Sequence, residues 1–220
     1  MKFFFIVTTS LINDNFEIRK NEYINAINKL ILELNKYSEF DKEIIIVENN
    51  GNRNTFLNEE FENLNNVKII YTNNNNFDVN KGIKELLDIK YICDNVNIND
   101  DDFIIKLTGR YIIKENSYFT KKLFNKCTLY DCFIKTGSIM SRNEKDIQDN
   151  FDCYTGLFAI KYKFIKNEIN HYLSNYKNHE WIEWIIIAII HKNIQNNKIK
   201  FLKKLDLYLK TVDMKNYELI

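Results

Sequence analysis

The sequence contains no proline and only five glycines, and none of the glycines lies in a GxGxxG or Walker A pattern. The GxSxG and HExxH patterns are also absent. A glycine-lined phosphate cradle is therefore excluded, and with it the classical dehydrogenases, P-loop enzymes and α/β-hydrolases. The missing proline and the abundant asparagine are typical of an AT-rich genome and carry no information about mechanism.

Metal motifs, long apolar runs and an excess of charge of one sign are missing as well. The four cysteines include no CxxC pair and lie at no zinc-site spacing from the three histidines, which favours reduced, buried thiols. No apolar stretch is long enough to span a bilayer or to act as a secretion signal. Lys and Arg number 31 against 30 Asp and Glu, so any anion site must be local. We expect a cytoplasmic protein, in the host cytoplasm if the source is a virus, with no membrane span and no nucleic-acid partner.

The first half of the sequence alternates between buried-strand and amphipathic-helix patterns. Apolar runs predict strands at 2–8, 43–47, 67–71 and 103–107. Apolar residues at helical spacing predict helices at 17–37, from about 56 to 64, and at 79–92. This order indicates an α/β fold with a mostly parallel central sheet and helices on both faces.

The second half breaks this alternation. We expect strands at 131–135, 154–162 and 199–209, helices at 164–172 and 181–191, and a long polar loop at 137–150. No linker composition and no repeat is present, and 220 residues suffice for a full sheet. We therefore predict a single domain over residues 1–220.

The segment DDDFIIKLTGRY at residues 100–111 carries the functional prediction. Its apolar part, residues 103–107, predicts a central strand in which Lys106 is the one charged residue. Gly109 is expected to let the chain turn sharply, which places Arg110 and Tyr111 at the carboxyl end of the strand, where open α/β sheets bind ligands. The alternative is a buried strand with a solvated acidic lead-in and an ordinary turn.

Polar residues also follow the other three predicted parallel strands, and we expect all four strand ends to converge on one edge. They offer hydroxyl and amide groups for a base and ribose, and cations for phosphates. Glu48 and Asn49 also suit a turn, Lys81 a solvated helix position, and Arg110 an ion pair with the acidic run. The predicted ligand-binding set is Thr8, Thr9, Ser10, Glu48, Asn49, Arg53, Thr72, Lys81, Lys106, Thr108, Gly109 and Arg110.

This layout resembles the GT-A glycosyltransferases, which transfer a sugar from a nucleotide-sugar donor. YTGLFAIK at 154–161 is similar to their acceptor-side strand, and WIEWII at 181–186 resembles the following helix, which carries an acid near its start. The closest resemblance is to small cytosolic transferases of large DNA viruses and some bacteria, which carry a Lys-x-Thr-Gly-Arg-Tyr stretch like residues 106–111. The likeness covers nearly the whole chain and implies a Rossmann-like architecture with a donor half at about 1–115 and an acceptor half at about 116–220.

The resemblance implies hexosyl or deoxyhexosyl transfer, in glycan biosynthesis, from a UDP-linked donor to a glycan or other hydroxyl acceptor. An inverting enzyme needs a carboxylate to take the proton of the acceptor hydroxyl. Glu183 is the preferred base because it interrupts an otherwise apolar helix turn, with Glu180 second and Asp152 third. Glu183 also suits a first-turn acid favoured by the helix dipole. Inversion and retention both stay open.

A divalent ion is an open question in this sequence. The family's DXD motif normally follows the apolar run of the strand and holds Mn²⁺ or Mg²⁺. Here the acids precede the strand at 103–107, so we favour Arg110, with Lys81, as the groups that neutralise the diphosphate. If the strand instead covers 96–98, Asp100 and Asp102 become a DXD motif.

Two further functions remain open, and nothing in the sequence indicates the oligomeric state. A sugar nucleotidyltransferase would normally need a glycine- and basic-rich loop after the first strand, which residues 8–15 lack. A non-catalytic α/β module that binds a nucleotide, protein or glycan at the same polar edge is the alternative outside enzymology.

Overall fold

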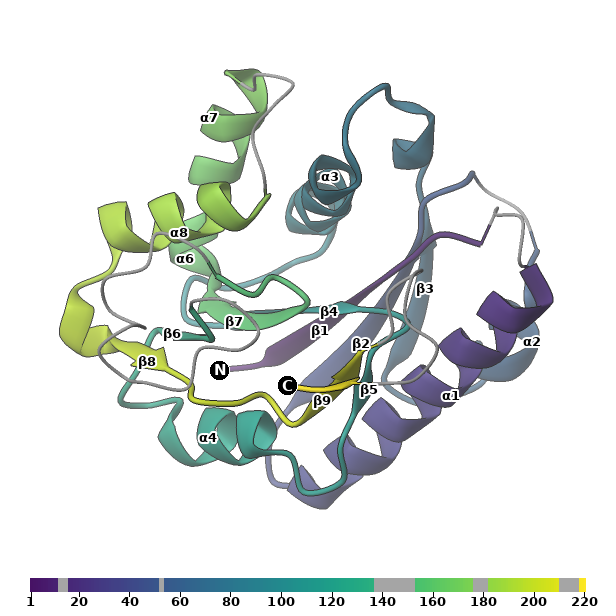
Figure 1. The fold of residues 1–220 in the computed structure, drawn as a ribbon, viewed down its shortest axis with the longest axis horizontal. Coiled ribbons are helices and arrows are strands. Elements are labelled where there is room, and N and C mark those ends of the chain that lie inside the picture. The colour runs from purple at the N-terminus through teal and green to yellow at the C-terminus, as the bar shows by residue number, and fades with distance from the viewer. Residues whose placement is uncertain (12–15, 52–53, 137–152, 176–181, 210–217) are drawn as a thin grey trace.

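The computed structural model describes residues 1–11, 16–51, 54–136, 153–175, 182–209 and 218–220 (Figure 1). Within these residues, seven strands form one sheet in the order β3-β2-β1-β4-β7-β6-β8, and a second sheet has the order β10-β9-β5. The strands are β1 (Phe3–Thr9), β2 (Lys42–Glu48), β3 (Val67–Tyr71), β4 (Phe103–Thr108), β5 (Ile112–Ile113), β6 (Cys132–Ile134), β7 (Leu157–Lys161), β8 (Ile199–Phe201), β9 (Leu207–Leu209) and β10 (Glu218–Leu219). The helices are α1 (Phe16–Leu34), α2 (Phe56–Phe61), α3 (Lys81–Asn95), α4 (Tyr118–Lys126), α6 (Tyr162–Ile165), α7 (Glu168–Ser174) and α8 (Ile182–Asn193).

The large sheet has the predicted α/β architecture. Its strands β3, β2, β1 and β4 are parallel, whereas β7 is antiparallel to both β4 and β6. Helices α1, α2 and α4 cover one face, and α3, α6, α7 and α8 cover the other (Figure 1). The prediction of a mostly parallel sheet with helices on both faces is confirmed.

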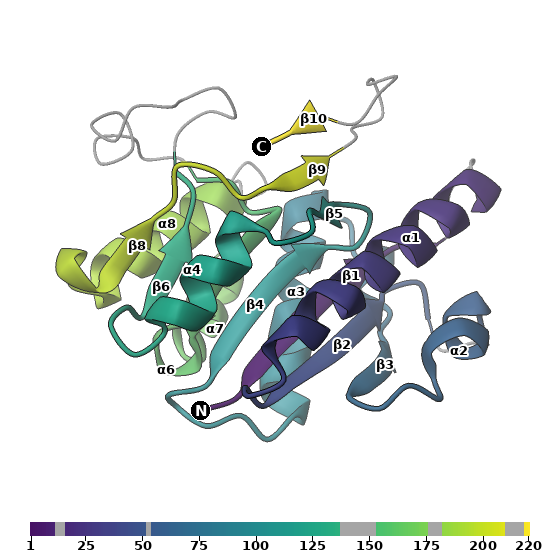
Figure 2. The same cartoon turned by 90° about the horizontal axis from the view of Figure 1, so that it is seen from below.

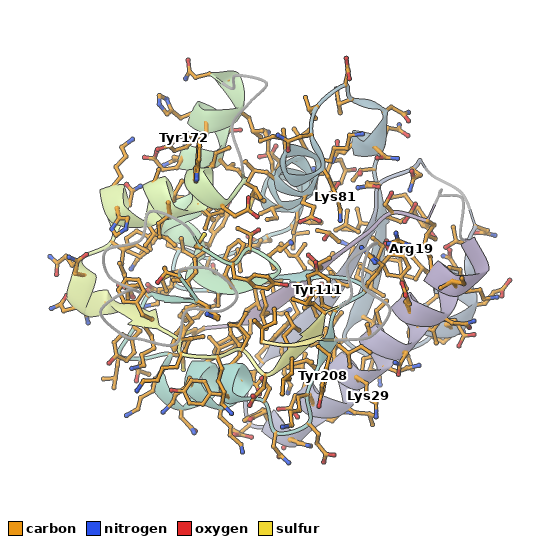
Figure 3. All side chains as sticks on the ribbon, viewed as in Figure 1. Arg19, Lys29, Lys81, Tyr111, Tyr172 and Tyr208 are labelled. Atoms are coloured by element: carbon orange, nitrogen blue, oxygen red, sulfur yellow. The ribbon has the colours of Figure 1, made fainter. Side chains whose placement is uncertain are left out.

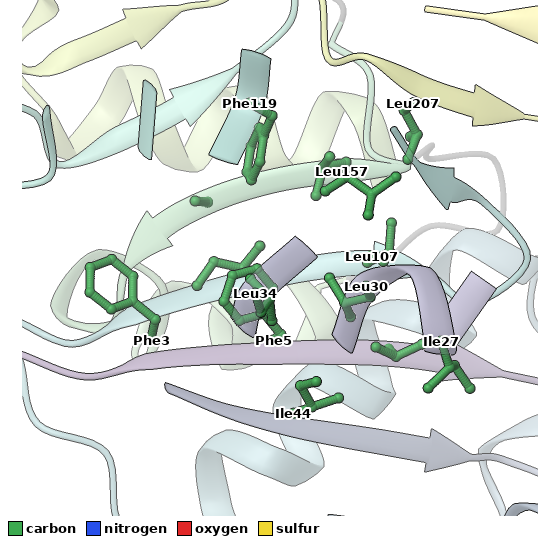
Figure 4. Packing of buried hydrophobic residues seen from close by; sticks show 14 of the residues in the cluster. Phe3, Phe5, Ile27, Leu30, Leu34, Ile44, Leu107, Phe119, Leu157 and Leu207 are labelled. Atoms are coloured by element: carbon green, nitrogen blue, oxygen red, sulfur yellow. The ribbon is translucent and has the colours of Figure 1, made fainter. Parts of the chain in front are cut away.

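Alternate side chains of the central strands fill two cores, one under each helical layer. Phe3 and Phe5 of β1 pack with Ile27 and Leu30 of α1 in the first core (Figure 4). Phe4 belongs to the second core, with the apolar residues of α3 and α8. β1 and β4 are buried on both faces, so nearly all of their residues are apolar. Such uninterrupted apolar runs made both strands easy to predict from the sequence.

The expected register of β4 is confirmed, and the alternative register is wrong. Val96 lies at the C-cap of α3, so residues 96–98 form no strand and β4 begins at Phe103. Asp102 accepts a hydrogen bond from the Lys2 backbone amide at 2.7 Å, beside the start of β1. The acidic run is therefore at the amino edge of the sheet, opposite the edge that Arg110 follows.

The late segments differ from the prediction in three places. The single strand expected at 199–209 is two short strands in different sheets, because the chain bends between them and Asp206 adopts a left-handed φ of 52°. The helix expected at 164–172 is split into α6 and α7, and α4 was not predicted. β9 pairs with β5, the strand that follows the turn after β4, and β10 pairs with the other edge of β9 (Figure 2).

The four cysteines are buried free thiols, as their spacing indicated. Burial raises the pKa of Cys93 to about 12 and raises that of Cys132 still further, so both are protonated at neutral pH. In the described part of the chain, no helix combines the length and apolarity that a bilayer crossing requires.

Candidate functional site

The carboxyl ends of β3, β2, β1 and β4 lie side by side, because these neighbouring strands are parallel. Thr8 is in register with Thr108, and the amide of Gly109 donates to the carbonyl oxygen of Thr8 at 3.0 Å. This edge borders a cleft of about 360 Å³, which we call the edge cleft. Seven residues of the predicted ligand-binding set line it: Thr8, Thr9, Ser10, Asn49, Lys81, Thr108 and Arg110.

The chain turns at Gly109 as predicted, with the Tyr111 amide donating to the carbonyl oxygen of Thr108 at 2.9 Å, but the glycine is needed there for space. Its φ is not in the left-handed region, where Gly51 lies at 97°. A Cβ on Gly109 would lie 2.8 Å from the carbonyl oxygen of Thr8 and 2.9 Å from both Thr9 Cγ2 and Tyr23 Cε1. The missing side chain lets the turn that carries Arg110 lie directly against the end of β1.

Positive side chains from three parts of the chain reach the edge cleft. Arg19 comes from α1 and Lys81 from the first turn of α3 (Figure 3). Lys84 comes from the next turn of α3, and Arg110 follows β4. Desolvation lowers the pKa of Lys81, and the nearby cations Arg110, Lys106 and Arg19 lower it further, against the opposing effect of Glu85. The cleft therefore has a concentrated positive charge although the whole chain is nearly neutral.

Glu48 and Thr72 hold the loops of this edge and do not line the cleft. Glu48 is fully buried, and its carboxylate accepts hydrogen bonds from Thr9 Oγ1 at 2.9 Å and Asn50 Nδ2 at 2.5 Å. Thr72 Oγ1 donates to Asp88 at 3.1 Å. Both residues were predicted as ligand contacts, but in the structure they fix the loops after β2 and β3.

Asp88 is a buried acid of α3 that connects these two loops. It accepts hydrogen bonds from Asn49 Nδ2 at 3.1 Å, Thr72 Oγ1 at 3.1 Å and Asn74 Nδ2 at 2.7 Å. Burial raises its pKa to about 7, and the three donors oppose that rise. Through Asn49, which lines the cleft, Asp88 fixes part of the cleft wall.

A second pocket of about 270 Å³, which we call the inner pocket, adjoins the edge cleft. The two share Lys81, Glu85 and Thr108 in their walls. Lys106 is fully buried there, with Nζ 2.5 Å from Glu85 Oε2 and donating to Thr108 Oγ1 at 2.6 Å. This buried ion pair fixes the wall between the two spaces.

Glu183 lines the inner pocket from the first turn of α8. Its Oε1 accepts a hydrogen bond from Thr155 Oγ1 at 2.8 Å, which fixes the carboxylate. The rings of Tyr111 and Tyr154 are stacked with centroids 6.3 Å apart and also line this pocket. The inner pocket thus combines a fixed carboxylate with two aromatic rings.

Three predicted residues, Arg53, Glu180 and Asp152, lie outside the described residues. The charged residues at the site that were missed include four: Arg19, Lys84, Glu85 and Asp88. A signal for three of them was present, because Lys81, Lys84, Glu85 and Asp88 have the 3, 4 and 7 spacing of one helix face. That polar stripe runs along α3 beside its apolar residues and points to the sheet edge.

The acids before β4 do not fit the divalent ion that the GT-A resemblance implies. Asp100 forms an ion pair with Lys166, and Asp101 lies 2.8 Å from Lys163 Nζ. Asp102 is buried, and its carboxylate accepts from the Asn99 backbone amide at 2.9 Å. A metal site at Asp100 and Asp102 required a strand at residues 96–98, and the structure has no strand there. Among the described residues, no cluster of three or more Asp, Glu, His or Cys has the arrangement of a metal site.

No family model and no curated protein sequence matches this chain. Several solved structures share its fold. The galactosyltransferase LgtC, in complex with donor and acceptor sugar analogues, matches with a TM-score of 0.56 and 10% identity, over 91% of this chain and 73% of that one. The synthase of 4-diphosphocytidyl-2C-methyl-D-erythritol from Anaerococcus prevotii matches with a TM-score of 0.53 and 13% identity, over 91% and 87%. S. aureus TarS in complex with UDP-GlcNAc matches with a TM-score of 0.53 and 15% identity, over 99% of this chain and 58% of that one. The chain therefore has the α/β fold of the GT-A nucleotide-sugar transferases.

Proposed function

We propose that the protein is a glycosyltransferase that moves a sugar from a nucleotide-sugar donor to a hydroxyl acceptor. The observation that carries the proposal is the pair of adjoining spaces at the carboxyl edge of the parallel strands. One is lined by cations and hydroxyl groups, and the other holds the fixed carboxylate of Glu183. In open α/β sheets this edge is where ligands bind.

The donor nucleotide would occupy the edge cleft. Thr9, Ser10 and Asn49 offer hydroxyl and amide groups to a base and ribose, and the cations beside them suit a diphosphate. A uracil base is our first choice, supported by the UDP-GlcNAc complex of TarS, which shares the fold. On this proposal residues 1–115 supply most of the donor site and residues 116–220 most of the acceptor site.

In an inverting transfer, Glu183 would act as the general base. The acceptor oxygen forms a bond to the anomeric carbon and gives its proton to Glu183. The bond from that carbon to the phosphate oxygen breaks, and the nucleoside diphosphate leaves with the electron pair. The hydrogen bond from Thr155 orients the carboxylate. A retaining transfer in the same pocket is the alternative course, and the anomeric configuration of the product distinguishes the two.

Transfer assays with a panel of UDP-, CDP- and GDP-sugars and simple glycan acceptors test this function. Glu183→Gln keeps an oxygen for the Thr155 hydroxyl but cannot take a proton. We therefore expect it to lower kcat by about 10²- to 10⁴-fold with little change in donor Kd. Glu115→Gln, at an exposed position, is the matched control and should leave both values unchanged. Full activity in the Glu183→Gln variant would refute the assignment of this base.

A sugar nucleotidyltransferase is the second candidate, because the Anaerococcus prevotii synthase shares the fold. Such an enzyme joins a nucleoside triphosphate to a sugar phosphate and releases pyrophosphate. Incubation with each nucleoside triphosphate and a panel of sugar 1-phosphates, with pyrophosphate release as the readout, separates the two functions. We expect no pyrophosphate above background.

A further inference from the structure

Among the described residues that line the edge cleft, cations outnumber carboxylates. Among the described lining residues, Glu85 is the one carboxylate, against the cations Arg19, Lys81, Lys84 and Arg110. Both oxygens of Glu85 already face ammonium groups, Oε2 at 2.5 Å from Lys106 Nζ and Oε1 at 3.9 Å from Lys81 Nζ. Glu85 therefore balances the buried charge of Lys106, and a single carboxylate is too few for a divalent ion, which needs several oxygen ligands.

The cations are held in place by the structure around the cleft. Lys84 Nζ donates to the carbonyl oxygen of Asn75 at 2.8 Å and to its Oδ1 at 3.2 Å. Arg110 is 7% exposed, with Nη1 3.8 Å from Glu22 Oε2. Desolvation, and after it the cations nearby, lower the pKa of Lys81, but its side chain is 68% exposed and is therefore held less firmly than Lys84 and Arg110. A bound anion would relieve this mutual repulsion.

Thr8 gives an independent indication that a polar ligand belongs here. Its side chain lines the cleft and the residue is 5% exposed. In the part of the chain that the structure describes, Thr8 Oγ1 has no hydrogen-bond partner. Buried hydroxyl groups nearly always have one. Thr8 Oγ1 is itself shielded from the cleft, so a ligand oxygen would supply the missing partner after rotation of the Thr8 side chain toward it.

The geometry points to direct binding of the donor's diphosphate by protein cations, with Arg19, Lys81, Lys84 and Arg110 in the place of a divalent metal ion. This inference rests on the glycosyltransferase function proposed above. Guanidinium and ammonium groups donate directly to phosphate oxygens and neutralise the charge that develops on the leaving group. Divalent ions need several oxygen ligands, and the acids of residues 100–102 lie at the opposite edge of the sheet.

Isothermal titration of UDP, CDP, GDP and ADP into the metal-stripped protein tests the inference. Each titration is run in EDTA, in Mg²⁺ and in Mn²⁺. We expect at least one nucleotide to bind in EDTA with a Kd within about twofold of its value with either metal ion. Binding that needs a metal ion would overturn the inference and leave the proposed function standing. If none of the four binds under any condition, the proposed function itself fails.

Substitutions on one helix show whether the cations make the contact. Lys81→Ala and Lys84→Ala should each weaken binding of the tightest nucleoside diphosphate in EDTA by about tenfold, and that of the nucleoside much less. Lys90→Ala is the matched control, because Lys90 is also on α3 but pairs with Asp94 away from the cleft. Thermal unfolding without ligand confirms that each variant is folded. Unchanged binding in both Lys81→Ala and Lys84→Ala would overturn the inference.

Discussion

At the scale of single residues, buried acids and one buried lysine give the site its shape. Asp88 and Glu48 accept hydrogen bonds from the loops after β2 and β3, and Glu85 pairs with Lys106 in the wall between the two spaces. None of these four groups is exposed enough to be an ordinary surface charge. Removing one partner would leave a buried charge or donor unsatisfied, which is costly.

The raised pKa of Asp88 predicts how the free energy of unfolding depends on pH. Its pKa rises from 3.8 to about 7 on folding, so the folded protein binds this proton more tightly than the unfolded chain does. The contribution of Asp88 to stability is therefore present below about pH 4 and is lost as the pH rises to about 7, by an amount on the order of 4 kcal/mol. Asp88→Asn removes the titration. Urea unfolding between pH 5 and 8 should show the free energy of unfolding of the wild type falling, relative to Asp88→Asn, as the pH increases. A difference that is constant or rises with pH contradicts the prediction.

At the scale of elements, the site depends on the close approach of β4 to β1. The turn after β4 places Gly109 against the carbonyl oxygen of Thr8, with no room for a side chain. The small sheet of β5, β9 and β10 then begins within a few residues of that turn, so the end of the chain packs beside the site. The pairing of β5 with β9, which are far apart in the sequence, thus supports the segment after β4 that carries Arg110.

Gly109→Ala tests this approach. The added Cβ meets backbone and cannot be relieved by a rotamer change, so the ends of β1 and β4 must separate. We expect a loss of about 1–3 kcal/mol in the free energy of unfolding. We also expect weaker binding of nucleoside diphosphate, measured by the same titration. A Gly109→Ala variant that matches the wild type in both measurements would show that the contact is not tight.

The sequence predicted some elements better than others for physical reasons. Strands β1 to β4 are mostly apolar, and the rule that parallel strands share a carboxyl edge was enough to bring Thr9, Asn49 and Arg110 together. Arg19 could not be placed, because which side of a helix faces the edge depends on how the helix packs. β9 and β10 have three and two residues, too few for any periodic pattern.

At the scale of the whole molecule, the chain has little net charge but an uneven distribution of it. The amino edge of the sheet carries the acids of residues 100–102, paired with nearby lysines. The carboxyl edge carries the cations that line the edge cleft. Net charge alone would not have revealed this uneven distribution, which suits the binding of a small anion at the carboxyl edge.

A crystal structure of the protein soaked with UDP and Mn²⁺ tests the central claim most directly. We predict density for the nucleotide along the carboxyl ends of β1, β2 and β4, with the diphosphate in contact with Lys81 and Arg110. We also predict no manganese at Asp100 or Asp102. A nucleotide bound at the amino edge, with its phosphates bridged by manganese to those acids, would contradict the account.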